Sequence, residues 1–181
     1  MANMYFVALV LPSEINDEIL KWKVFMKDHF NCMVALRSPA HITLVPPFWM
    51  TDTLENELEK GITQFSQRQA PLEVQLKNFA AFKPRVIYVD VLSNPTLQTL
   101  KARLFDYLIA QNLFPIEEDD RPFHPHVTIA TRDLHKKAFQ EAWEVFKNKS
   151  YSALCTITGV SLLRHNQKNW DVVFTSQFQK I

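Results

Sequence analysis

The sequence HITLVPPF at residues 41–48 has a near repeat, HPHVTIA, at residues 124–130. Both segments contain a histidine, an apolar residue, a threonine and a second apolar residue in that order. Side chains two residues apart on a β-strand project from the same face, so each segment can present its histidine and its threonine together. The repeat therefore predicts two strands that bury their apolar residues and direct an imidazole and a hydroxyl to the opposite face.

Strands and helices are expected in the same order around both segments, which divides the chain into halves of approximately 1–83 and 84–181. In the first half we expect a strand at 5–11, a helix from Ser13, strands at 32–36 and 41–45, a helix at 54–65 and a strand at 72–82. In the second half we expect a strand at 85–92, a helix from Pro95, a strand at 126–131, a helix that includes 139–146, a long strand at 153–163 and a final strand at 169–178. Alternation of apolar and polar residues predicts the strands, and apolar residues spaced three and four apart predict the helices. Together they predict one α+β domain over residues 1–181, with two antiparallel-sheet lobes related by a pseudo-twofold axis, helices outside and a central cleft.

Composition and charge narrow the classes of function. Apolar residues make up 47% of the chain, as in globular proteins, and the net charge of +1 provides no overall field to recruit long nucleic acids or anionic membranes. The apolar N-terminal stretch is too short to span a bilayer and lacks the flanks of a signal peptide. Two cysteines without a pairing pattern favour a reducing compartment, so we expect a cytoplasmic protein. With two glycines in all, the chain has neither a Walker nor a Rossmann phosphate loop.

The two repeated pairs supply the groups that phosphoryl transfer needs. An unperturbed histidine has a pKa near 6.5, so near neutral pH one of His41 and His126 can accept a proton while the other donates one. The hydroxyls of Thr43 and Thr128 can donate to non-bridging phosphate oxygens. If the lobes face one cleft, a phosphate fits between the imidazoles when their ring nitrogens lie roughly 5–8 Å apart. We therefore expect these four residues to be catalytic, with no metal or other cofactor.

At these residues the sequence also resembles a known family. HITLVPPF and FHPHVTIA are similar to the paired signatures of the two-histidine (2H) phosphoesterase superfamily, in particular its 2'-5' RNA ligase and RNA 2',3'-cyclic phosphodiesterase group. The resemblance extends over nearly the whole chain and implies the bilobal fold of that family. It also implies metal-independent hydrolysis or transesterification of 2',3'-cyclic or 2'-5' phosphodiester bonds. The family's catalytic histidines fall on His41 and His126, and its phosphate-binding hydroxyls on Thr43 and Thr128.

The second signature departs from the family pattern at one position. Many relatives have a basic residue two positions after the last apolar residue of the triplet, whereas here Thr131 intervenes before Arg132. This difference leaves the natural substrate open but not the chemistry. Ligation is the reverse of the same transesterification, so the sequence does not separate the two directions.

Six further residues are expected to contact the substrate, namely Arg85, Tyr88, Phe48, Phe123, His124 and Arg132. The two phenylalanines flank the triplets, where an aromatic ring can stack on a nucleobase. The tyrosine belongs to the strand that begins the second half, and the arginines offer phosphate contacts. For the aromatic residues core packing is an equally good interpretation, and for the arginines a solvated surface position is.

Two other functions remain open at this point. His124 and His126 have a spacing that can ligate zinc on a strand, with His41 as a third ligand. The same fold can also serve as a non-catalytic protein that binds nucleotides or RNA ends. Intact triplets in both halves favour catalysis, because a binder needs phosphate donors but neither an acid nor a base. We accordingly expect a monomer whose partner is an RNA end or a nucleotide cyclic phosphate, with no metal site and no membrane.

Overall fold

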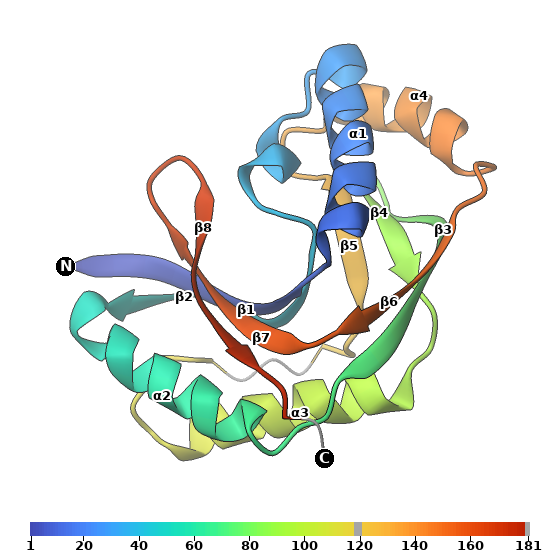
Figure 1. The fold of residues 1–181 in the computed structure, drawn as a ribbon. Coiled ribbons are helices and arrows are strands. Elements are labelled where there is room, and N and C mark those ends of the chain that lie inside the picture. Colours follow the sequence, from blue (N-terminus) through green and yellow to red (C-terminus); the bar gives the residue numbers. More distant parts are fainter. Residues whose placement is uncertain (118–120, 180–181) are drawn as a thin grey trace.

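The chain folds into two four-stranded antiparallel sheets and four helices, as a computed structural model shows for residues 1–117 and 121–179 (Figure 1). The strands are β1 (Ala2–Val10), β2 (His41–Thr51), β3 (Leu72–Phe82), β4 (Val86–Val91), β5 (His126–Ala130), β6 (Ser152–Ile157), β7 (Gly159–His165) and β8 (Trp170–Gln177). The helices are α1 (Ser13–Phe30), α2 (Glu55–Ser66), α3 (Pro95–Ala110) and α4 (Lys136–Phe146), with short 3-10 helices at η1 (Val34–Arg37) and η2 (Asp52–Leu54). The predicted α+β class with two antiparallel sheets is confirmed.

The two sheets exchange strands between the halves of the sequence. The first sheet has the order β2-β1-β7-β8 and the second has the order β5-β4-β3-β6. Thus β3 from the first half pairs with β4, and β7 from the second half pairs with β1. Two helices also cross over, since α1 contacts β5 and α3 contacts β2. Figure 1 shows α1 beside α4 and α2 beside α3, on opposite sides of the curled sheets. Each sheet of the pseudo-twofold arrangement therefore contains strands from both halves of the sequence.

The apolar residues of both triplets face the hydrophobic core, as the alternation predicts. Ile42 and Leu44 on β2 are fully or almost fully buried, and so are Val127 and Ile129 on β5. The threonine between each pair is only partly buried. Burying one face of each strand fixes its register, because a slip by one residue would move the apolar side chains into solvent. The core therefore determines which way the histidines and threonines point.

The strand expected at residues 32–36 is wrong. Residues 32 and 33 lead into η1 and residues 34–36 belong to it, and a side chain far along the sequence holds the segment there. The Asp133 carboxylate accepts hydrogen bonds from the backbone N–H groups of Met33 (2.7 Å) and Val34 (3.1 Å), and from Cys32 Sγ (3.0 Å). These N–H groups thus have a carboxylate partner in place of a neighbouring strand. Apolar alternation in a short window carries no information about such a partner.

The long strand expected at 153–163 is two strands in different sheets. The chain pairs with β3 as β6, leaves the second sheet at Thr158 and joins the first sheet as β7. Gly159 begins β7 and lies opposite Gln177 of β8. A Cβ atom at Gly159 would lie 2.5 Å from the backbone oxygen of Ser176, so only glycine permits this close approach. The sequence pattern did not show the crossing, because β6 and β7 follow each other with only Thr158 between them.

Gly159→Ala is expected to destabilise the fold by about 1–3 kcal/mol, because the added methyl group overlaps a backbone atom that has little room to move. Gly61→Ala is the matched control. There the added Cβ would meet mainly the end of the Gln111 side chain, which can move, and alanine favours the helix by about 1 kcal/mol. Urea unfolding of both variants checks the prediction. Equal stability of the two would contradict the role given to Gly159.

No helix within residues 1–117 and 121–179 is both long and apolar enough to cross a membrane.

Candidate active site

The two triplets come together because the strands that carry them are edge strands facing each other. β2 is an edge strand of the first sheet, β5 is an edge strand of the second, and the two are in contact. The triplets occupy equivalent places in the two ladders: His41 lies opposite Val10 of β1, and His126 lies opposite Asp90 of β4. Thr43 and Thr128 follow two residues later on the same faces. The duplication seen in the sequence is thus a duplication in space.

Both imidazoles are held by the same local hydrogen bond. Nδ1 of His41 lies 2.7 Å from the carbonyl oxygen of Pro39, and Nδ1 of His126 lies 2.7 Å from the carbonyl oxygen of His124. A carbonyl oxygen only accepts, so each Nδ1 carries the hydrogen and donates it. Each Nε2 is therefore left to accept a proton when the ring is neutral or to donate one when the ring is charged. This is the division of labour that a pair of acid–base groups requires.

Aromatic rings surround both histidines. The ring of His41 lies 4.9 Å from that of Phe6, and the ring of His126 lies 5.1 Å from Tyr88 and 5.0 Å from Phe82. Burial disfavours the charged imidazolium, so it lowers the pKa of His41 to about 4 and also lowers the pKa of His126. Nearby charged groups also affect the pKa of each ring. Lys23 affects His41, and both His124 and Asp90 affect His126.

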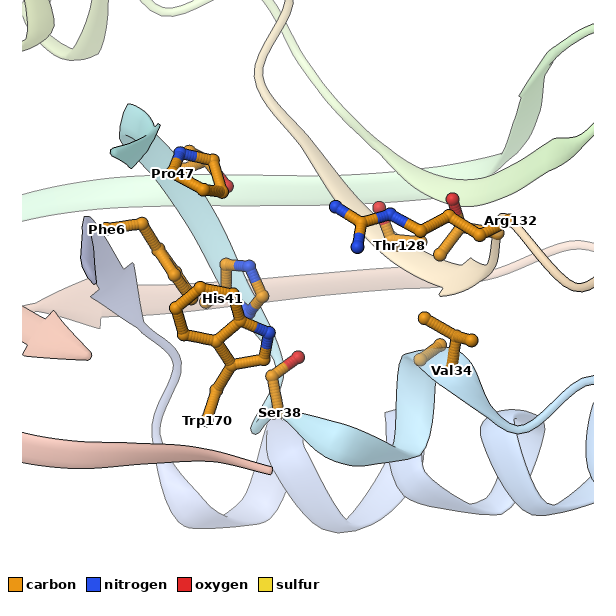
Figure 2. Close-up of a pocket in the computed structure, with 11 residues that line it drawn as sticks. Phe6, Val34, Ser38, His41, Pro47, Thr128, Arg132 and Trp170 are labelled. Atoms are coloured by element: carbon orange, nitrogen blue, oxygen red, sulfur yellow. The ribbon is translucent and has the colours of Figure 1, made fainter. Parts of the chain in front are cut away.

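Two adjoining pockets open onto the triplets and share Thr43. The residues of the first pocket that matter for its chemistry are Phe6, His41, Thr43, Thr128, Arg132 and Trp170. In Figure 2, Phe6, His41 and Trp170 stand on one side of this pocket, and Thr128 and Arg132 stand on the other. The second pocket includes Thr43, Phe82, Lys101, Phe123, His124 and His126. Imidazole, hydroxyl and cationic groups therefore converge on one cleft with aromatic walls.

Arg132 lines the first pocket despite the additional residue before it. Its backbone has a φ of 47°, in the left-handed region that a non-glycine residue seldom adopts. The guanidinium points into the pocket between Thr128 and the aromatic side formed by Phe6 and Trp170 (Figure 2). Such a conformation costs free energy and is typical of functional sites. The unusual backbone thus turns the arginine side chain toward the cleft.

The other expected substrate contacts divide into three groups. Phe123 and His124 line the second pocket. Tyr88 is 3% exposed and contacts two histidines of the site. Its ring lies beside that of His126, and its hydroxyl lies 3.1 Å from His124 Nε2. Phe48 and Arg85 lie elsewhere: Phe48 is 7% exposed and packs near Tyr5, and Arg85 is exposed in the turn between β3 and β4. The core interpretation therefore holds for Phe48, and the surface interpretation holds for Arg85.

Sequence reasoning missed several side chains at the site. Trp170 begins β8 and packs edge-on against Phe6, with ring centroids 4.7 Å apart, and Phe82 ends β3. Each comes from a strand without a triplet, and only the tertiary pairing brings it to the cleft. An aromatic residue at a strand end next to a turn is too common a pattern to single out either one.

The structure shows no set of zinc ligands in the part of the chain that it describes. No three histidine, cysteine, aspartate or glutamate side chains gather there to hold a metal ion. His124 Nε2 is instead close to the Tyr88 hydroxyl and lies 3.4 Å from Asp90 Oδ1. It is thus engaged by β4, and this contact separates its role from that of the two triplet histidines.

Comparisons with known proteins show the family to which the chain belongs. Residues 11–169 match the family described as the 2'-5' RNA ligase superfamily. The RNA 2',3'-cyclic phosphodiesterase of Bacillus subtilis (strain 168) is 28% identical over 96 residues, or 51% of this chain and 51% of that protein. The match likewise spans about half the length of a Bacillus pumilus relative, at 31% identity over 97 residues.

Solved structures share the fold over the whole chain. Escherichia coli LigT in complex with 3'-AMP superimposes with a TM-score of 0.73 at 18% identity, covering 99% of this chain and 100% of that one. The complex of the same protein with ATP gives a TM-score of 0.68 at 16% identity, covering 99% and 100%. At these identities the likeness concerns the fold, whereas the family match covers most of the sequence with both triplets inside it. The chain belongs to the 2'-5' RNA ligase superfamily, a group of two-histidine phosphoesterases.

Proposed function

We propose that this protein is a phosphodiesterase that opens 2',3'-cyclic phosphates or cleaves 2'-5' phosphodiester bonds at the end of a short RNA or on a nucleotide. One observation carries the proposal: two imidazoles whose Nδ1 atoms are held by carbonyl oxygens, each two residues before a threonine on a facing edge strand. A protein that only binds phosphate needs the hydroxyls and a cation, but not two such imidazoles.

The reaction follows from the groups present. With a cyclic phosphate bound between the triplets, one histidine takes a proton from a water molecule as the water oxygen forms a bond to phosphorus. The bond from phosphorus to one ribose oxygen breaks, and the other histidine gives its Nε2 proton to that oxygen. The hydroxyls of Thr43 and Thr128 donate to the non-bridging oxygens, where negative charge accumulates. The guanidinium of Arg132 adds a cationic donor on the same side as Thr128.

The size and charge of the site favour a short substrate. The net charge of the chain is +1, and the cationic residues that line the two pockets are Lys101, Arg121 and Arg132, with His124 and the two catalytic histidines. Aromatic residues stand in both pockets, Phe6 and Trp170 in the first and Phe82 and Phe123 in the second. Bases on either side of the phosphate can therefore stack without a long basic groove.

Turnover of a panel tests the proposal: nucleoside 2',3'-cyclic phosphates, ADP-ribose cyclic phosphate, 2'-5' dinucleotides and short RNA with a cyclic phosphate end. We expect hydrolysis of at least one of these, with a phosphomonoester as the product of the cyclic substrates. Binding of the whole panel without turnover would contradict the proposal and support a non-catalytic binder. Incubation of RNA that ends in a 2',3'-cyclic phosphate with RNA that begins with a 5'-hydroxyl tests ligation at the same site, because the new phosphodiester bond then forms as one bond of the cyclic ester breaks.

Turnover is expected to be unchanged within about twofold after exhaustive dialysis against EDTA, because the histidines supply both proton transfers and the hydroxyls supply the phosphate contacts. The measurement is kcat for the best substrate of the panel, with and without chelator. A loss of activity that zinc alone restores would instead assign a metal to the histidine pair His124 and His126. A zinc-dependent phosphatase treated in the same way serves as the control for chelation.

A further inference from the structure

The two histidines are equivalent in backbone position but not in their charged surroundings. The cross-strand neighbour of His126 is Asp90, whereas the cross-strand neighbour of His41 is Val10. Two residue pairs further along the ladders, Tyr88 lies opposite Thr128 where Ala8 lies opposite Thr43. Opposed residues on one face of a sheet lie close enough to interact directly. The second triplet thus has a carboxylate and a phenol where the first has two aliphatic side chains.

The carboxylate of Asp90 contacts both a backbone N–H group and the side chain of His124. Its Oδ1 accepts a hydrogen bond from the N–H of Val91 (3.0 Å) and lies 3.4 Å from His124 Nε2. The Tyr88 hydroxyl holds the same nitrogen of His124 at 3.1 Å. The carbonyl oxygen of His124 in turn accepts the Nδ1 hydrogen of His126. Asp90 therefore acts on His126 in two ways, through its charge and by fixing the residue that orients the ring.

The first triplet has a buried cation in its surroundings instead. Lys23 on α1 is 3% exposed, and its Nζ donates to the carbonyl oxygen of Ser38 at 2.9 Å. Ser38 lines the same pocket as His41 and directly precedes Pro39, the residue that holds the His41 ring. In a buried setting a cation acts over several ångströms with little screening. A second positive charge on His41 is therefore disfavoured, and Lys23 also fixes the loop that orients this ring.

We infer that Lys23 and Asp90 are positioning residues that make the histidine pair unequal, so that in hydrolysis His41 takes the proton of the water and His126 gives its proton to the leaving ribose oxygen. The inference rests on the proposed function and adds the direction of proton flow to it. When the pair holds a single proton, that proton sits on His126, beside the carboxylate, and His41 is neutral, beside the cation.

The remaining charged groups that line the two pockets are cations or histidines. His41 shares its pocket with Arg132, a further cation that opposes its protonation, and faces His126. His126 shares its pocket with Lys101, Arg121 and His124, which oppose the effect of Asp90. Lys101 is directed toward aromatic rings, with its Nζ 4.4 Å from the ring centroid of Phe105 and 6.0 Å from that of Phe123.

Burial lowers the pKa of both histidines, but the charges of Lys23 and Asp90 act on them with opposite sign. After burial, which is the largest cause of the lowered pKa of each ring, the positive charge of Lys23 lowers the pKa of His41 further. For His126, a protonated His124 lowers the pKa while Asp90 raises it. The charges of Lys23 and Asp90 thus act on the two rings with opposite sign, and a protonated His124 opposes the effect of Asp90.

Two variants remove one charge each while keeping the side-chain size: Asp90→Asn and Lys23→Met. Asp106→Asn and Lys21→Met are the matched controls, because both positions are exposed, on α3 and α1 respectively. The first readout is the pH dependence of kcat/KM for a nucleoside 2',3'-cyclic phosphate. The second is the NMR titration of the histidine rings without substrate, which does not depend on activity.

In Asp90→Asn, His126 becomes harder to protonate, so its titration and the alkaline limb of kcat/KM move to lower pH by about 0.5–1 unit. The shift is modest because the Asp90 side chain is 36% exposed. In Lys23→Met, His41 becomes easier to protonate, so its titration and the acid limb move to higher pH by about 1 unit. Asp90→Asn thus narrows the plot of kcat/KM against pH from the alkaline side, and Lys23→Met narrows it from the acid side. Neither variant raises the plateau of this plot, and the two controls leave the plot unchanged.

Unshifted limbs and unshifted ring titrations in both variants would overturn the inference. A plateau that rises as the profile narrows would also overturn it, since the productive enzyme would then carry its proton on His41. If the wild-type chain turns over no member of the panel, the proposed function fails, and the NMR titration still decides whether Lys23 and Asp90 make the two histidines unequal. His126 is expected to gain its proton at higher pH than His41, and the reverse order would contradict it.

Discussion

Replacement of His41 or His126 by alanine is expected to lower kcat for the best substrate by about 10²–10⁴-fold in each case, the usual contribution of a positioned acid or base. Each ring has its Nδ1 hydrogen bonded to a carbonyl oxygen, so that Nε2 alone is available for proton transfer. The hydroxyls of Thr43 and Thr128 cannot replace it, because they do not exchange protons readily near neutral pH. The loss should therefore appear in kcat and not only in KM.

The double variant His41→Ala, His126→Ala should lose much less than the product of the two single losses, because acid and base act as a unit in one step. His135→Ala is the matched control, since His135 is exposed at the start of α4. Steady-state kinetics on the wild type and these four variants, with thermal melts to confirm folding, make the comparison. Full activity of His41→Ala together with an inactive His126→Ala would contradict a mechanism with two histidines.

The sequence sufficed to locate the triplets because two local signals agree there. Alternation fixed which face of each strand is buried, and Ile42 and Val127 are indeed in the core. Repetition then distinguished the histidines from ordinary polar residues on a strand. The same alternation could not show that Arg132 turns into the cleft, because its left-handed backbone has no signature in the neighbouring residues.

Contacts between distant segments lie beyond such local patterns. Lys23 is one polar residue on an otherwise apolar helix face, and its buried contact with Ser38 depends on how η1 and β2 are connected. Asp90 lies between buried residues on β4, and only the pairing of β4 with β5 places it beside His126. The exchange of β3 and β7 between sheets likewise depends on the pairing of whole strands. The local sequence thus determines the chemistry of the triplets, and the tertiary fold determines their electrostatic environment.

Thr43→Val and Thr128→Val are each expected to lower kcat by up to about 10²–10³-fold, the loss typical of one donor to a developing negative charge. Valine retains the branched shape that suits a strand, so the variants remove the hydroxyl without disturbing β2 or β5. Thr43 lines both pockets whereas Thr128 lines only the first of the two, so the loss should be at least as large for Thr43→Val.

The matched control is Thr156→Val, at an exposed position of β6. The measurement is kcat and KM for a cyclic substrate across the bell-shaped pH profile. Its limbs should stay in place, because the hydroxyls do not titrate in this range. An effect on KM alone would mean that the hydroxyls hold the ground state and the transition state equally well. A lowered kcat with unchanged limbs would instead place the threonine donors where charge develops on the phosphate, so that the histidines move protons while the hydroxyls stabilise the oxygens between them.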